Sequence, residues 1–108
     1  MMLVVMMLAL AGPNPRTLDA PRKTYSACIK GFETSSLKAK LDAAAYSTAV
    51  KGACQPEAAA LAKALVNYDV AMGGKRAAAN ANAQSDVADY VLTSEERYRD
   101  SVSASKPQ

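Results

Sequence analysis

The chain has 108 residues, with 13 basic and 10 acidic side chains, a net charge of +3 and no histidine. Its length suffices for one small domain. Because histidine is the commonest general base and a frequent metal ligand, and because no phosphate-binding loop or Gly-x-Ser-x-Gly motif occurs, we expect no enzymatic activity, no cofactor and no metal site.

Residues 1–11 contain no charged or polar side chain, and they end with small residues at Ala9 and Ala11, just before Gly12-Pro13. This pattern is typical of a secretory signal peptide that is cleaved after Ala11. No basic residue precedes the apolar run, so either the true start lies upstream or the signal is weak. The alternative is a buried N-terminal segment, whereas a stable membrane span would need about 20 apolar residues. We therefore expect a secreted or periplasmic protein.

Three prolines fall in residues 12–21, which we expect to form an extended leader. Helical periodicity begins at Arg22, and we expect a single helical domain over 22–102, followed by a disordered tail over 103–108. The first helix is expected to end at Lys30-Gly31, since a cation in the last turn and then a glycine are typical of helix ends. Four of its residues share one face at helical spacing: Tyr25, Cys28, Ile29 and Phe32.

The start of the second helix has two candidate positions. Ser35 or Ser36 can cap it, and so can Asp42. The helix is expected to end at Lys51-Gly52, and its inner face carries Tyr46, Val50 and Ala53.

The third helix is expected to have Pro56 in its first turn and to stop at Gly73-Gly74. Its predicted inner face comprises Leu61, Ala64, Leu65, Tyr68 and Met72.

A fourth helix follows Lys75-Arg76, and Glu95 and Arg99 favour a surface pairing on it. Its predicted inner face comprises Ala83, Val87, Tyr90, Val91, Ser94, Tyr98 and Val102. No segment alternates polar and β-branched residues over a useful length. The sequence therefore predicts an all-α protein, a small bundle of about four helices.

Two cysteines, Cys28 and Cys54, are most simply a structural disulfide in an exported chain. Such a bridge closes about 27 residues and contributes roughly 3.6 kcal/mol in the chain-entropy model. An intermolecular bridge and two free thiols are the alternatives, and two thiolates alone do not fill a zinc site. A tight turn at residues 33–36 would place Cys28 opposite a residue near 41. An intramolecular bridge therefore predicts a longer excursion over Glu33–Leu41, with the second helix starting near Asp42.

The arrangement Tyr25-x-x-Cys28, followed by Ala49-Val50-x-x-Ala53-Cys54-x-x-Glu57, resembles small exported helical proteins of proteobacteria that have no assigned function. A looser resemblance exists to the small periplasmic acid-stress chaperones, which are also helical, exported and linked by one disulfide. The cysteine spacing here is shorter than theirs. These resemblances imply a small exported helical fold, and they carry no functional residue over to this chain.

Charge is uneven along the chain, because residues 12–41 carry an excess of four positive charges while the rest is slightly acidic. This basic segment could contact an anionic surface such as lipid headgroups or a cell-wall polymer, or it could simply be solvated. The residues concerned are Arg16, Arg22, Lys23, Lys30, Lys38 and Lys40.

The sequence leaves two further interpretations open. One is a binding module or holdase-type chaperone that uses an apolar surface for an unknown protein partner or for self-association. The other is a polar stripe for a cation or partner, formed by Asn82, Asp86, Asp89 and Thr93, although we expect this stripe to be a solvated face. We expect no nucleic-acid partner.

Overall fold

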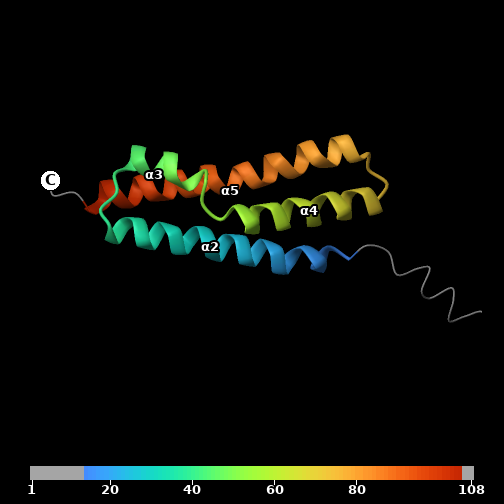
Figure 1. The fold of residues 1–108 in the computed structure, drawn as a ribbon, viewed down its shortest axis with the longest axis horizontal. Coiled ribbons are helices and arrows are strands. Elements are labelled where there is room, and N and C mark those ends of the chain that lie inside the picture. The colour runs from blue at the N-terminus through green and yellow to red at the C-terminus, as the bar shows by residue number, and fades with distance from the viewer. Residues whose placement is uncertain (1–13, 106–108) are drawn as a thin grey trace, which may run out of the picture.

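The computed structural model describes residues 14–105, so the predicted signal peptide over 1–11 lies outside the described part. Within residues 14–105 all regular structure is helical, which confirms the all-α prediction. The described residues form four α-helices preceded by one short 3₁₀ helix, and Figure 1 shows how the α-helices lie side by side in a bundle. The elements are η1 (Pro15–Leu18), α2 (Asp19–Lys38), α3 (Ala43–Val50), α4 (Gln55–Ala71) and α5 (Arg76–Ser105).

The four α-helices form three arms. α2 runs in one direction, α3 and α4 together run back, and α5 returns along both (Figure 1). α4 packs against α2 and α5, whereas α3 packs mainly against α5. The arm formed by α3 and α4 is stepped, because the turn at 51–54 moves the chain sideways between them.

Helical structure starts earlier than the sequence predicted. Asn14 caps η1 by accepting a hydrogen bond from the Arg16 backbone N–H at 2.9 Å. Pro21 lies in the first turn of α2, where its missing N–H breaks no helical hydrogen bond. The predicted extended leader over 12–21 is therefore wrong from Pro15 onward, and the domain begins before Arg22.

α2 continues through Gly31, so the predicted helix end at that residue is wrong. Gly31 is exposed, and a Cβ placed on it would meet nothing within 4 Å. The helix continues because Phe32, Glu33 and Ser36 pack inward beyond it. Tertiary packing thus overrides the local signal of a cation followed by glycine.

The predicted excursion over Glu33–Leu41 is replaced by more helix and a tight turn. Lys40 takes a left-handed conformation with φ 58°. The Leu41 N–H donates to the Ser36 carbonyl at 3.0 Å, and the Lys40 N–H donates to the Leu37 carbonyl at 3.0 Å. These two bonds form a Schellman motif. Asp42 then caps α3 by accepting from the Ala45 N–H at 2.8 Å, which confirms the later of the two predicted starts.

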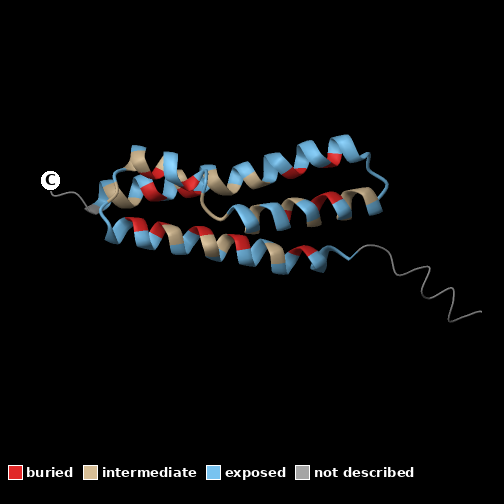
Figure 2. Cartoon of the chain, viewed as in Figure 1, coloured by how far each residue is buried: buried red, intermediate tan, exposed pale blue. Residues whose placement is uncertain are grey.

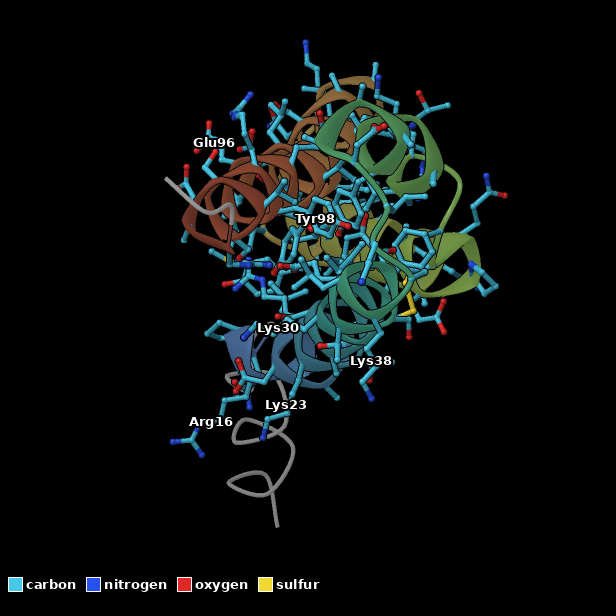
Figure 3. The ribbon with its side chains drawn as sticks, turned by 90° about the vertical axis from the view of Figure 1, so that its left-hand side faces the viewer. Arg16, Lys23, Lys30, Lys38, Glu96 and Tyr98 are labelled. Atoms are coloured by element: carbon cyan, nitrogen blue, oxygen red, sulfur yellow. A yellow bond between two sulfur atoms is a disulfide. The ribbon has the colours of Figure 1, made fainter. Side chains whose placement is uncertain are left out.

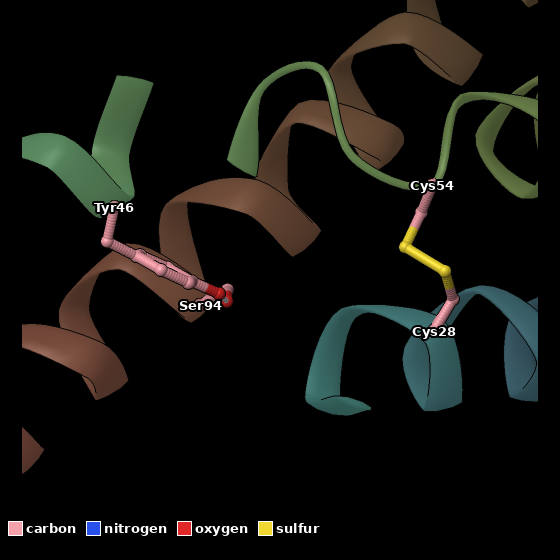
Figure 4. The surroundings of a disulfide bond; sticks show 4 residues. All are labelled: Cys28, Tyr46, Cys54 and Ser94. Carbon is pink, nitrogen blue, oxygen red and sulfur yellow. Dashed lines mark hydrogen bonds between the residues drawn. A yellow bond between two sulfur atoms is a disulfide. The ribbon is translucent and has the colours of Figure 1, made fainter. Parts of the chain in front are cut away.

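The predicted disulfide is confirmed. Cys28 and Cys54 are bonded, with their Cα atoms 6.0 Å apart. The turn after α2 lies midway in sequence between the two cysteines, so the chain that runs back brings Cys54 beside Cys28. Figure 4 shows the bridge between α2 and the loop that precedes α4. Cys54 is the N-cap residue of α4 and has a left-handed φ of 59°.

The predicted stop at Gly73-Gly74 is also confirmed, because α4 ends at Ala71. Gly73 has φ 99°, and the Gly74 N–H donates to the Asp69 carbonyl at 2.8 Å. α5 continues to Ser105, so the predicted disordered tail is wrong for residues 103–105.

The core lies on the inner sides of the helices and combines three buried tyrosines with leucine, isoleucine, valine and alanine side chains (Figure 2). The rings of Tyr46 and Tyr98 stack with centroids 3.8 Å apart and an interplanar angle of 6°. The hydroxyls of Tyr46 and Ser94 share a 2.6 Å hydrogen bond, and the Tyr98 hydroxyl donates to the Leu41 carbonyl at 2.6 Å. Met72 departs from the predicted inner face, since it is 62% exposed.

We predict that Tyr46→Phe lowers the free energy of unfolding by about 1–3 kcal/mol, because Ser94 is fully buried and loses its hydroxyl partner. Urea unfolding followed by circular dichroism measures the change. Tyr68→Phe is the control, since the Tyr68 hydroxyl bonds to no other described residue. Adding Ser94→Ala to Tyr46→Phe should recover part of the lost free energy of unfolding. If the effects of the two substitutions simply add, the two hydroxyls are not coupled and the prediction is wrong.

We also predict that Gly31→Ala raises the free energy of unfolding by about 1 kcal/mol, because alanine is the better residue in an exposed helix interior. Gly73→Ala should instead lower it by about 1 kcal/mol or more, because alanine at positive φ is strained. Thermal unfolding of the two variants compares them directly. A destabilised Gly31→Ala variant would contradict the uninterrupted α2.

Candidate functional site

Four basic side chains lie along the outer side of η1 and α2, and we call them the α2 basic face: Arg16, Lys23, Lys30 and Lys38. All four are exposed. Lys23 and Lys30 are seven residues apart, about 20° short of two full turns, and Lys38 lies about 80° from Lys30 around the helix. Figure 3 shows the four side chains fanned around the outside of this arm.

Small residues occupy the outer positions between these cations. Ala20, Ala27 and Thr34 are all exposed on the same side of α2. Because their side chains are short, the ammonium and guanidinium groups are the outermost atoms of the face. Leu37 is the one large apolar residue on this side, and it is 39% exposed.

The other two basic residues singled out from the sequence lie elsewhere. Arg22 is turned about 100° from Lys23 and lines a hollow with Asp86, Asp89 and Tyr90 of α5. Lys40 lies in the turn after α2. The structure therefore brings four of the six predicted residues onto one face.

Three carboxylates bear on the charge of the α2 basic face: Asp19, Glu33 and Asp89, which lines the same hollow as Lys30. Asp19 is exposed and precedes Lys23 by one helical turn, so it offsets one positive charge. Glu33 is buried and accepts a hydrogen bond from Arg97 Nε at 2.8 Å, while a second Arg97 nitrogen contacts its other oxygen. Glu33 is therefore already neutralised by α5 and does not face solvent beside the lysines.

The Glu33–Arg97 pair also fixes α2 against α5. Its hydrogen bonds raise the pKa of Arg97, and this outweighs the opposing effect of burial. It is the single ion pair among residues 14–105, so the predicted pairing of Glu95 with Arg99 does not form. This pair could not be predicted from the sequence, because its two partners are 64 residues apart and neither has a local pattern that points to the other.

A hollow of about 310 Å³ lies beside the α2 basic face, along the seam between α2 and α5. Lys30 and Arg97 line it from opposite helices, together with Asp89, Tyr90 and Thr93. The predicted polar stripe on α5 is exposed at all four of its positions, as expected for a solvated face: Asn82, Asp86, Asp89 and Thr93.

Charge is unevenly distributed between α2 and α5, although Asp86 and Asp89 of α5 line hollows beside Arg22 and Lys30 of α2. The exposed side of α2 is basic, whereas α5 carries five acidic residues against three basic ones. Figure 3 shows Glu96 on the α5 side, away from Arg16, Lys23 and Lys38. The exposed side of α2 is therefore more favourable to an anionic partner than α5 is.

Large exposed apolar residues do not gather into one patch within residues 14–105. Leu37 lies near the end of α2, Met72 follows α4 at the opposite end of the bundle, and Leu92 lies midway along α5 (Figure 1).

Among residues 14–105, no helix is both long enough and apolar enough to cross a membrane. The hydroxyl pair Tyr46–Ser94 is shielded from solvent and cannot contact a substrate.

The sequence matches no protein-family model, and comparisons with curated proteins and with solved structures give no significant match.

We predict that stability falls as pH rises above about 10. Burial raises the pKa of Tyr25, Tyr46 and Tyr98. Below the ordinary tyrosine pKa all three are protonated in both states, so their contribution is fully present. Above it the unfolded chain loses protons that the folded chain retains, and the free energy of unfolding decreases.

Urea unfolding between pH 8 and 11 measures this decline. Tyr46→Phe should show a shallower decline, because one of the three groups is removed. An equally steep decline in that variant would contradict the assignment.

Proposed function

We propose that the protein is a non-enzymatic exported binding protein that attaches to an anionic surface through the α2 basic face. The observation that carries this proposal is the alignment of Arg16, Lys23, Lys30 and Lys38 on one exposed side of a single helical arm. Export is supported by the apolar run over 1–11 and by the disulfide, which is typical of oxidising compartments.

The expected attachment is electrostatic and reversible. A basic residue beside an anionic lipid surface contributes about 1 kcal/mol at low salt, so four of them contribute about 4 kcal/mol, and Asp19 reduces this sum. Such an energy corresponds to a dissociation constant on the order of millimolar for one copy. Leu37 alone among the large apolar residues lies on this side, so the contact is expected to remain at the level of the headgroups.

Anionic lipid is the ligand that we propose for this face. The cations from Lys23 to Lys38 span about 22 Å along α2 and about 80° around it, so they can approach a flat array of phosphates together. A soluble anionic polymer presents the same chemistry along a line, and it serves as a competitor in the test. We do not extend the proposal to a holdase, since the exposed apolar residues are scattered.

Co-sedimentation with vesicles tests the proposal at low salt. Wild-type protein should bind vesicles that contain phosphatidylglycerol, and it should not bind vesicles of phosphatidylcholine alone. The variant with glutamine at Arg16, Lys23, Lys30 and Lys38 should lose most of this binding. Binding of the wild type should also fall steeply as salt approaches physiological strength, because exposed charges are screened.

A matched control replaces four exposed cations outside the α2 basic face and therefore lowers the net charge by the same amount: Lys51, Lys63, Lys75 and Arg76. This control should bind almost as well as the wild type. Equal losses in the two variants would mean that net charge, not the arrangement on α2, determines binding, and the proposal would be wrong. Binding that resists salt would contradict its electrostatic basis.

A further inference from the structure

Three potential metal ligands converge where α2 meets the start of α4. The sulfur atoms of Cys28 and Cys54 and a carboxylate oxygen of Glu57 all lie within 4.8 Å of one another. Cys28 comes from the middle of α2, Cys54 is the N-cap of α4, and Glu57 lies in the first turn of α4. All three side chains are half-buried.

We propose that Cys28, Cys54 and Glu57 bind one zinc-class divalent ion when the disulfide is reduced. Two thiolates and one carboxylate are typical zinc ligands, and a water molecule would complete a tetrahedral site with one open position. The two thiolates alone do not fill a zinc site, and the fold supplies Glu57 as the third ligand. This site does not involve the α2 basic face and is independent of the proposed function.

The required rearrangement is small. In a tetrahedral zinc site with Zn–S bonds of about 2.3 Å, two sulfurs lie ~3.8 Å apart, and a sulfur and a carboxylate oxygen lie ~3.5 Å apart. The three ligand atoms already lie within 4.8 Å, so side-chain rotations can bring them into place without moving α2 away from α4. The bound ion would then link the same two helices that the disulfide links.

The chemistry balances with a thiol or phosphine reductant. The disulfide takes up two electrons and two protons, giving two thiols, while a dithiol is oxidised to its disulfide or a phosphine to its oxide with water supplying the oxygen. Zinc then displaces the two thiol protons. Cys54 lies at the N-terminus of α4, where the positive end of the helix dipole favours the thiolate.

Cobalt(II) is the spectroscopic probe, and a phosphine is the reductant. The reduced protein should bind one equivalent and show the near-ultraviolet thiolate-to-cobalt charge-transfer band, which one equivalent of zinc should abolish. The oxidised protein should show no band. Glu57→Gln should weaken metal binding at least tenfold, whereas Asp69→Asn, which changes a half-buried carboxylate about 18 Å further along α4, should have no effect.

The absence of a cobalt band in the reduced protein would overturn the proposal. Unchanged affinity in Glu57→Gln would overturn the three-ligand site. Circular dichroism provides a second measurement for the case in which reduction loosens the fold. Zinc should then restore the helical signal of the reduced wild type but not that of Cys28→Ser, and failure to restore it would count against the site.

Discussion

The covalent link between Cys28 and Cys54 holds the middle of α2 against the point where α3 gives way to α4. The core on either side of this link is small. It includes the stacked Tyr46 and Tyr98 of α3 and α5, and Leu61, Leu65 and Val66 of α4. With so few large aliphatic side chains, the conformational entropy removed by the disulfide, roughly 3.6 kcal/mol, is a large fraction of the stability that a domain of this size attains.

The same link determines what α2 presents to solvent. The inner side of α2 is occupied by Tyr25, Ile29 and Glu33, which contact α5 or the core. Rotation of α2 about its axis would break the disulfide and the pair between Glu33 and Arg97, so the lysines have to point outward. A fixed set of outward cations on α2 is the physical basis of the proposed attachment to an anionic surface.

Local chemistry made several features predictable from the sequence. Asp42 caps α3, and glycines end α4. Cys28 and Cys54 lie at equal sequence distances from the turn after α2, and they form a disulfide with each other. The predicted helix end at Gly31 was wrong, because a cation followed by glycine also occurs inside a helix where the glycine is exposed. Lys40 was missed as the left-handed residue because a lysine there carries no local signal.

The bond between Glu33 and Arg97 depends on how α2 and α5 meet, which spacing along the chain does not encode. The α2 basic face could have been found, since Arg16, Lys23 and Lys30 recur every seven residues.

Urea unfolding of the oxidised wild type and of the Cys28→Ser, Cys54→Ser double variant tests the central claim most directly. The free energy of unfolding of the double variant should be lower by roughly 3.6 kcal/mol, with helicity retained only at low urea. If the two proteins unfold at the same urea concentration with the same slope, the disulfide does not hold this bundle together, and the account of a fixed α2 is wrong.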